Sequence, residues 1–185
     1  MKIKKTTKEV KIDEKFIQES LKYYYDSGAR YMVPNIHFFD YGYGETDLLV
    51  VREGKKRLIY DIEIKVSKAD YKRDFKKVVK HERLEKGTLT KRRRWSFKPQ
   101  EGKRRMIKAN EALKLNDRPN RFFFAVPEGL ITEEELPPYA GLLYIDNRGN
   151  VTKIKEGKLL HKEEVPHEAR LCRKFYFYWL NALKK

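Results

Sequence analysis

Residues 57–67 read RLIYDIEIKVS, and this stretch decides the fold. Apolar and polar residues alternate along it, and successive side chains of a strand point to opposite faces, so the pattern predicts a β-strand. The apolar face carries Leu58, Tyr60, Ile62, Ile64 and Val66, and the polar face carries Asp61, Glu63, Lys65 and Ser67. The strand therefore offers one face for packing and another on which charged groups gather.

A second strand is predicted at residues 46–51, joined to the first by a tight turn at residues 53–55. If the turn centres on residues 54 and 55, the numbers of facing residues sum to 109 or 110, which places Asp47 opposite Ile62 or Glu63. With a one-residue bulge, Asp47 converges with Glu63 and Lys65. Glu45 and Asp61 then lie at the edge of the cluster.

Two carboxylates at such close range repel each other, and Lys65 offsets only part of that repulsion. A divalent cation would offset more, and hard oxygen ligands of this kind suit Mg²⁺ or Mn²⁺. A metal held there would polarise a phosphodiester and lower the pKa of a bound water, which Lys65 could orient. The alternative is an exposed polar hairpin face with ordinary cross-strand ion pairs.

The rest of the chain predicts further helices and strands around this hairpin. Asp13 is placed to cap a helix that closes at Gly28, and Ser67 is placed to cap a helix over residues 68–84. The buried stripe expected of that second helix is Tyr71, Phe75, Val78 and Val79, extending to Leu84. Strands are expected at residues 31–39, 121–126, 141–146 and 150–155, a short helix at 106–115, and an aromatic C-terminal helix at 166–185.

The composition points to an anionic partner. The chain has 43 Lys and Arg against 27 Asp and Glu, a net charge of +16. Of this, +12 lies between residues 72 and 108, where 16 basic residues face four acidic ones. A surplus of this size usually meets nucleic acid, through salt-dependent phosphate contacts.

The charge gathers in residues 85–120, which read as a basic insertion or arm within one domain spanning residues 1–185. Basic side chains can neutralise phosphates, and aromatic ones can stack on exposed bases. The residues predicted to contact nucleic acid are Lys80, Lys91, Arg92, Arg93, Arg94, Trp95, Lys103, Arg104 and Arg105. The alternative for the segment is a solvated loop whose Trp95 and Phe97 pack back on the body.

Other classes of protein fit poorly. One cysteine, Cys172, allows no disulfide framework and no cysteine-based zinc site, which suits a cytoplasmic protein. No apolar run is long enough to span a membrane, and no signal peptide is recognisable. The four histidines lack metal-ligand spacing, and His37 is expected to be a structural histidine in an apolar strand. Packing roles are expected for the aromatic residues Tyr139, Tyr176, Phe177, Tyr178 and Trp179.

Asp47, fifteen further residues and then Glu63-Ile64-Lys65 form a pattern that resembles the PD-(D/E)xK nuclease superfamily. Residues 63–71 and 120–130, with Leu136-Pro137 and residues 141–143, look like phage-type nuclease-like proteins and MmcB-like DNA-repair proteins. The resemblance covers residues 13–146. It implies an α/β fold with a restriction-endonuclease-like core, in which helices flank a mixed sheet of about four to six strands.

The same resemblance implies the roles of the site residues. Asp47 and Glu63 would bind Mg²⁺ or Mn²⁺, the Ile64 carbonyl would be a further ligand, and Lys65 would be the catalytic lysine. Glu45 would be an outer acid or serve a second metal. The residue before Asp47 is Thr46 rather than the proline of the motif's name.

The function expected is therefore that of a Mg²⁺-dependent deoxyribonuclease, an endonuclease that hydrolyses phosphodiester bonds in DNA. A protein of nuclease fold that binds DNA in repair or replication without cutting it is the alternative, and an RNA-binding basic protein is a third. DNA is the expected partner and a membrane is not. The basic arm could also serve a homodimer.

Overall fold

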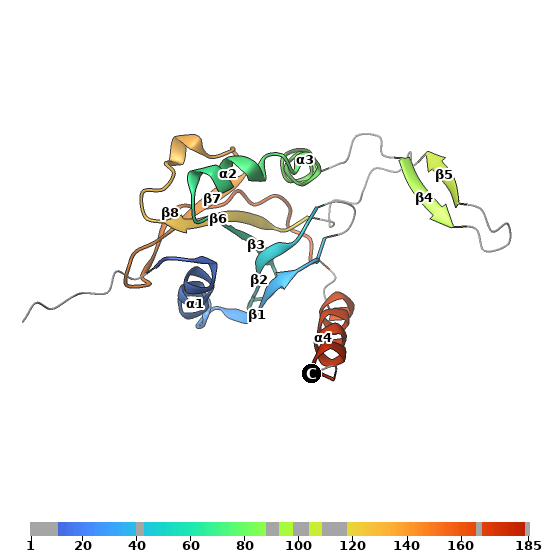
Figure 1. Ribbon diagram of the computed structural model, residues 1–185, viewed down its shortest axis with the longest axis horizontal. Coiled ribbons are helices and arrows are strands. Elements are labelled where there is room, and N and C mark those ends of the chain that lie inside the picture. Colours follow the sequence, from blue (N-terminus) through green and yellow to red (C-terminus); the bar gives the residue numbers. More distant parts are fainter. Residues whose placement is uncertain are drawn as a thin grey trace, which may run out of the picture.

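A six-stranded sheet runs through the molecule in the order β1-β2-β3-β6-β7-β8, with helices on both of its faces (Figure 1). The computed structural model describes residues 11–39, 43–87, 93–97, 104–108, 118–165 and 168–183, with only the backbone for 93–97 and 104–108. The sheet strands are β1 (Ala29–Ile36), β2 (Thr46–Arg52), β3 (Ile59–Ile64), β6 (Arg121–Pro127), β7 (Ala140–Ile145) and β8 (Val151–Lys155). The remaining elements are α1 (Glu14–Tyr25), α2 (Lys68–Asp74), α3 (Val78–Lys86), β4 (Arg93–Phe97), β5 (Arg104–Lys108), the 3₁₀ turn η1 (Glu133–Glu135) and α4 (Glu168–Ala182).

The sheet is mixed, which confirms the predicted α/β class. β1, β2 and β3 form an antiparallel meander, β6 is parallel to both β3 and β7, and β8 closes the far edge antiparallel to β7. A parallel neighbour requires a crossover, and α2 and α3 lie on the connection from β3 to β6. The continuous apolar run of β6 follows from this position, because a central strand between two layers of helices is buried on both faces.

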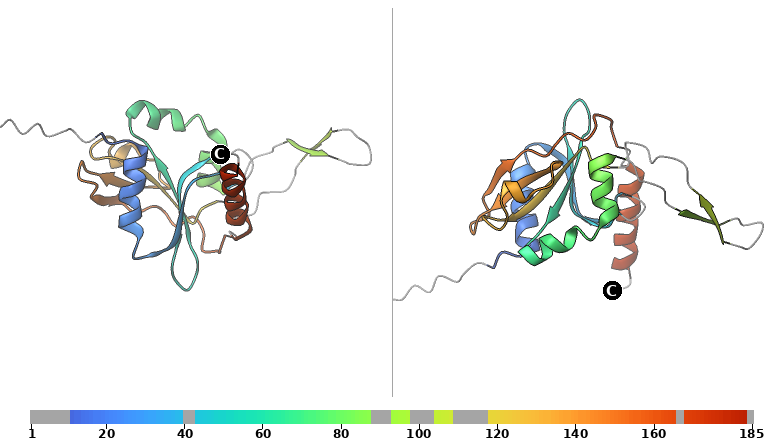
Figure 2. Two further views of the ribbon diagram at one scale, coloured as in Figure 1. Left: turned by 60° about the horizontal axis from the view of Figure 1, so that its bottom comes forward. Right: turned by 90° about the horizontal axis from the view of Figure 1, so that it is seen from above.

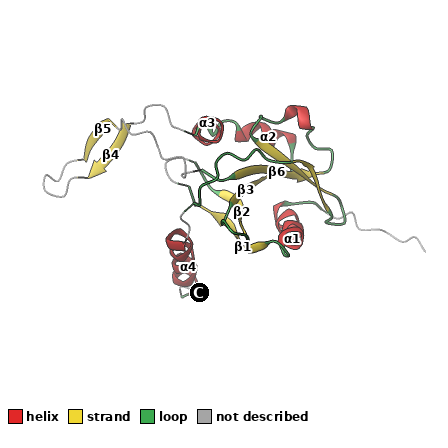
Figure 3. Ribbon diagram, turned by 180° about the vertical axis from the view of Figure 1, so that it is seen from behind, coloured by secondary structure: helices red, strands yellow, loops and turns green. Residues whose placement is uncertain are grey.

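Each face of the sheet has its own apolar core. On one face, Ile17, Leu21 and Tyr25 of α1 pack against the side of β2 and β3 that carries Leu48 and Ile62. On the other face, α2 and α3 contribute Tyr71 and Leu84. Figure 2 shows α1 on the side of the sheet opposite to α2 and α3, and Figure 3 shows the same layers from behind. The polar face of β3 therefore lies beneath α2 and α3.

The prediction of a single helix over residues 68–84 is wrong, because the segment forms two helices, α2 and α3. Ser67 caps α2 as expected, accepting a hydrogen bond from the Asp70 N–H at 3.2 Å. The chain then turns at residues 75–77, where the Lys77 N–H bonds to the Asp74 carbonyl at 2.8 Å, and α3 begins at Val78. The turn rotates the second helix, so Phe75 and Val78 of the predicted buried stripe are exposed.

The C-terminal helix forms where it was predicted, but its packing differs from the prediction. Tyr139 is buried as expected, whereas Tyr176, Phe177, Tyr178 and Trp179 are all about half exposed, and no residue of α4 is buried. Two polar contacts attach α4 to the end of β1: Arg170 Nη1 donates to the Phe38 carbonyl at 2.9 Å, and Lys174 Nζ donates to the Asn35 carbonyl. His37, expected to be a structural histidine, is exposed.

The basic insertion contains a two-stranded antiparallel sheet formed by β4 and β5, with Arg93 opposite Lys108 and Phe97 opposite Arg104. The predicted helix at 106–115 is wrong at its start, because residues 104–108 are a strand, and the rest lies outside the described residues. Lys91, Arg92 and Lys103 also lie outside them. No helix in the described part of the chain is long and apolar enough to cross a membrane.

Candidate functional site

The hairpin register brings Asp47 and Glu63 to adjacent positions. β2 and β3 pair without a shift from Leu48 opposite Ile62 to Val51 opposite Ile59, so facing residue numbers sum to 110. This is one of the two registers predicted, and it needs no bulge. Directly beyond the last pair, Asp47 Oδ2 accepts a hydrogen bond from the Ile64 N–H at 2.7 Å. The pairing of the two strands therefore holds Asp47 beside the Glu63-Ile64-Lys65 segment.

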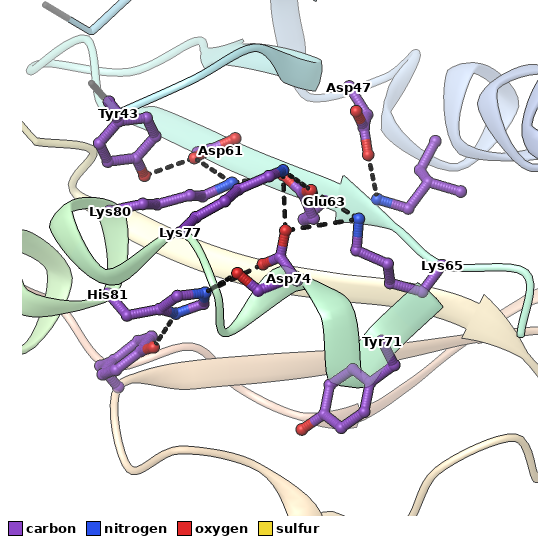
Figure 4. A network of polar contacts seen from close by, with 12 residues as sticks. Tyr43, Asp47, Asp61, Glu63, Lys65, Tyr71, Asp74, Lys77, Lys80 and His81 are labelled. Atoms are coloured by element: carbon purple, nitrogen blue, oxygen red, sulfur yellow. Dashed lines mark hydrogen bonds and ion pairs between the residues drawn. The ribbon is translucent and has the colours of Figure 1, made fainter. Parts of the chain in front are cut away.

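Glu63 is the centre of the site, because three ammonium groups surround its carboxylate (Figure 4). Its side chain is completely buried. Lys65 Nζ lies 2.6 Å and Lys77 Nζ 2.7 Å from Glu63 Oε1, and Lys80 Nζ contacts Oε2. A buried carboxylate is stable only when it is paired, and charge-assisted hydrogen bonds are the strong kind. The three lysines therefore make the burial of Glu63 possible.

Asp74, at the end of α2, is a second buried carboxylate that contacts two of the same lysines. Its Oδ1 lies 2.8 Å from Lys77 Nζ and 3.5 Å from Lys65 Nζ, and its Oδ2 lies 3.1 Å from His81 Nε2. Burial alone would raise the pKa of Asp74, but the contact with His81 and the charge of Lys80 hold it well below its usual range. Asp74 therefore remains ionised and shares Lys65 and Lys77 with Glu63.

Asp61 and Lys80 form the deepest part of the cluster. Tyr43 donates its hydroxyl to Asp61 Oδ2 at 2.5 Å, and Lys80 Nζ lies 3.9 Å from the same oxygen. The Lys80 ammonium also lies 4.9 Å from the ring centre of Phe122, within the range of a cation–π contact. Burial acts to lower the pKa of Lys80, but the negative charges of Asp61 and Glu63 outweigh it and raise the pKa. Lys80 is thus a buried cation.

This position corrects the prediction for Lys80. The side chain has no exposed surface, so it is not a surface contact for phosphate. Its physical role is to neutralise two carboxylates on β3. The alternative offered for the hairpin, an exposed face with cross-strand ion pairs, is also wrong at Asp61 and Glu63, because both are buried and their cationic partners include Lys77 and Lys80.

His81 links this cluster to β7. Tyr139 Oη lies 2.5 Å from His81 Nδ1, and His81 Nε2 also lies 3.1 Å from the Asp74 carbonyl. The imidazole stacks on Phe75, with ring centres 4.7 Å apart. The ring is thus held at both nitrogens and on one face, and it fixes the carboxylate of Asp74.

Asp47, like Asp61, is a carboxylate whose pKa is raised by burial. Burial and the charge of Glu63 raise its pKa to about 7, against the lowering effects of the Ile64 N–H, Lys65 and Lys80. Gln18 of α1 donates to the Asp47 carbonyl at 3.0 Å and holds the backbone in place. At Asp47 the nearby lysines therefore do not fully offset burial and the charge of Glu63.

The donor chemistry of the site fits a hard cation, although the described residues do not form a ready-made metal centre. No three His, Cys, Asp or Glu side chains in the described ranges converge closely enough to hold a metal ion. Yet the lysines only partly offset burial and the charge of Glu63 at Asp47, and the oxygens of the buried Asp74 are held by ion pairs to Lys77 and His81 without a well-aligned hydrogen bond. Both features would be relieved by a small cation with no directional demands.

The structure brings Asp47, Glu63 and Lys65 close together, as predicted. Their roles in metal binding and catalysis stay predictions. Glu45 is exposed, and Ile64 contributes its N–H to Asp47, while a ligand role for its carbonyl stays untested. Arg93, Arg94, Trp95, Arg104 and Arg105 lie on β4 and β5, where their contact with nucleic acid also stays a prediction.

Sequence reasoning missed Asp74 and Lys77, did not connect His81 with them, and placed Lys80 in the wrong role. One signal was present. Asp74, Lys77 and His81 recur at steps of three and four residues, the spacing that lines up side chains on one face of a helix. Polar residues at that spacing, directly after a strand with a charged face, are candidates for contact with that face. The apolar stripe assigned to the same helix concealed this pattern.

Comparison with known proteins supports the fold alone. No protein-family model matches the chain, and no curated protein matches it. A solved structure of a protein of unknown function from Silicibacter pomeroyi is similar, with a TM-score of 0.54 and 19% sequence identity. The alignment covers 94% of this chain and 90% of that chain. The likeness therefore extends over nearly the whole described architecture.

Proposed function

We propose that this protein is a metal-dependent deoxyribonuclease that hydrolyses phosphodiester bonds. The observation that carries the proposal is the meeting of Asp47, Glu63 and Lys65 on one strand pair. Asp47 is hydrogen-bonded to the residue after Glu63, and the Lys65 ammonium lies 2.6 Å from the Glu63 carboxylate. These are the residues that the resemblance to PD-(D/E)xK nucleases assigns to metal binding and catalysis.

In this proposal Asp47 and Glu63 hold Mg²⁺ or Mn²⁺. The bound metal would supply a water of lowered pKa and polarise the scissile phosphate. Lys65 orients the attacking water and stabilises negative charge that develops on the phosphate. Its ammonium is kept in place by Glu63 and Asp74, and Asp74 is in turn fixed by His81.

DNA is the partner that we propose, with the protein acting inside the cell. The basic segment around β4 and β5 supplies phosphate contacts, and a homodimer could form through the same arm. Removing residues 91–105 should weaken DNA binding and flatten its dependence on salt, because each lost phosphate contact lowers the salt slope by about 0.9 for duplex DNA. Filter binding at several salt concentrations measures both effects, and an unchanged slope would exclude this surface.

A second function is favoured by a specific observation. Three ammonium groups already hydrogen-bond to the Glu63 carboxylate. This arrangement suits a protein that uses the fold to bind DNA without cleaving it. In that case the cluster holds the domain together and DNA contacts lie elsewhere. A preference for RNA over DNA that is equally salt-sensitive would point to the third possibility, an RNA-binding protein.

The deciding experiment is cleavage of linear, nicked, branched and single-stranded DNA with Mg²⁺ or Mn²⁺. Glu63→Gln and Lys65→Met are the test variants, because both keep the volume of a buried side chain, and Lys76→Met is the matched control at an exposed lysine. Each test variant should cut at least about 100-fold more slowly, the usual scale for losing a group that stabilises a transition state. The control should cut normally.

Circular dichroism must show that each variant is folded. If the wild-type protein binds DNA tightly without cutting, and both test variants bind equally well, the nuclease proposal fails and the binding function takes its place.

A further inference from the structure

Among the lysines around Glu63, Lys77 has the most accessible side chain. Lys65 is 7% exposed and Lys80 has no exposed surface, whereas Lys77 is 40% exposed. Because a lysine side chain has a long, flexible aliphatic stem, its ammonium group can move into water while the backbone stays in place. The Lys77 ammonium is therefore the one that can leave the cluster at the smallest cost.

The backbone of Lys77 does not depend on its side chain. Its N–H donates to the Asp74 carbonyl at 2.8 Å, and its carbonyl accepts from the Lys80 N–H at 2.9 Å. Lys77 is the N-cap residue of α3, and its side chain makes no capping hydrogen bond. The turn between α2 and α3 can thus persist when the ammonium moves away.

The ammonium occupies a position between two buried carboxylates. It lies 2.7 Å from Glu63 Oε1 and 2.8 Å from Asp74 Oδ1, so it bridges β3 and α2 (Figure 4). The side chain of Asp74 is completely buried and is held by charge: Oδ1 lies 2.8 Å from Lys77 Nζ and Oδ2 lies 3.1 Å from His81 Nε2, with no well-aligned hydrogen bond at either oxygen. A contact held by charge and not by hydrogen-bond direction is one that a metal cation can replace.

The charge balance of the cluster agrees with such an exchange. Four carboxylates in the described residues, Asp47, Asp61, Glu63 and Asp74, meet the three ammonium groups of Lys65, Lys77 and Lys80. With all four carboxylates ionised, the formal charge is one negative unit. Replacement of the Lys77 ammonium by a divalent cation would bring the formal sum to neutrality.

We propose that the Lys77 ammonium can be exchanged for a metal ion. It occupies the position between the Glu63 and Asp74 carboxylates, and a divalent cation enters the site by displacing it. Asp74 then becomes a carboxylate ligand alongside Glu63, at the position that the ammonium leaves. The displaced ammonium moves to the surface beside the site, where a substrate phosphate would meet it. This last step rests on the proposed nuclease function, whereas the exchange itself does not.

The test is Mn²⁺ binding, measured by calorimetry on the full chain without DNA. Lys77→Met removes the competing ammonium and keeps the aliphatic stem. It should bind Mn²⁺ at least about tenfold tighter than wild type, because no ammonium has to leave the position between Glu63 and Asp74 before the metal binds. Lys76→Met is the control at the neighbouring exposed lysine and should match wild type. Adding Asp74→Asn to Lys77→Met should abolish the gain.

Lys77→Gln keeps a hydrogen-bond donor and serves if Lys77→Met fails to fold. Unchanged or weaker Mn²⁺ binding by the folded Lys77 variants would overturn the proposal, and so would a gain that survives Asp74→Asn. In the wild-type protein, Mg²⁺ should also increase the rate at which Lys77 is acetylated by a small reagent, read by mass spectrometry. A purely structural Lys77 would show no such increase.

The two proposals can fail separately. If wild type cuts DNA but the Lys77 variants bind Mn²⁺ no more tightly, the exchange is wrong and the nuclease stands. If the variants bind Mn²⁺ more tightly but no form of the protein cuts DNA, the exchange stands and the nuclease is wrong.

Discussion

The cluster around Glu63 and the helix α4 depart from the usual placement of side chains in opposite directions. The cluster buries charged groups beneath α2 and α3, whereas α4 leaves aromatic side chains exposed, with Phe175 at 76%. Burial of a charge is costly unless partners satisfy it, so every member of the cluster depends on the others. Truncation of an exposed aromatic ring removes little buried surface and therefore costs little stability. The same type of substitution should therefore have very different effects in the two regions.

The largest effect is expected where a buried ammonium is removed. Lys80→Met leaves Asp61 and Glu63 with less compensating charge, and breaking a buried ion pair costs about 3–5 kcal/mol. Urea unfolding measures the loss in the free energy of unfolding. Lys76→Met, at an exposed lysine, should stay within about 0.5 kcal/mol of wild type. A Lys80 variant as stable as this control would show that the cluster is not held by its charges.

A second prediction compares the loss of stability when a buried and an exposed phenylalanine are each truncated to alanine. Phe124 of β6 is completely buried, so Phe124→Ala should cost about 3–5 kcal/mol, whereas Phe175→Ala on α4 should cost no more than about 0.5 kcal/mol. Thermal unfolding of the two variants at the same protein concentration gives the comparison. Equal losses would mean that α4 is covered in solution.

A third prediction concerns pH and Asp47. Its pKa is about 7 in the folded protein against an ordinary value of 3.8, so the folded state binds more protons between these two values. Asp47 therefore lowers stability progressively as pH rises from about 4 to about 7, and Asp47→Asn should remove this loss. The variant should gain about 1–2 kcal/mol over wild type at pH 8 but little at pH 4, after allowance for partial exposure.

Urea unfolding in a metal chelator at the two pH values tests this. The control is Glu45→Gln, which removes an exposed carboxylate from the segment just before β2. It should change stability equally at both pH values. A gain for Asp47→Asn that is larger at pH 4 would contradict the electrostatic account.

The smallest effect is expected at the edge of the cluster. Tyr139→Phe removes the hydroxyl that contacts His81 Nδ1, and loss of one such hydrogen bond costs about 1 kcal/mol. Tyr23→Phe, at a tyrosine that is 77% exposed, is the control and should be neutral. Chemical denaturation of both variants is sufficient. A neutral Tyr139→Phe would show that Phe75 and Asp74 alone hold the imidazole.

The two regions also differ in how far the sequence predicted them. Asp47 and Glu63 were placed together because the turn and the two-residue period of a strand are local rules, and the observed register obeys one of the two sums expected. The break between α2 and α3 was not predicted, because the sequence at residues 75–77 carries neither Pro nor Gly. For α4, the aromatic pattern predicted a helix correctly but also predicted packing that the structure does not show.

The sequence by itself determined the alternation of residues 57–67, the hairpin with two possible registers for Asp47, and the order along the chain of the six strands of the main sheet. All of these depend on neighbours within a few residues or on one short turn. Only the tertiary structure decided that α2 and α3 lie over the charged face of β3 and bring Lys77 and Lys80 to Glu63, 14 and 17 residues along the chain. The physical reason is that a carboxylate's partners and burial depend on which helix face meets the sheet, and that is settled when the two layers pack.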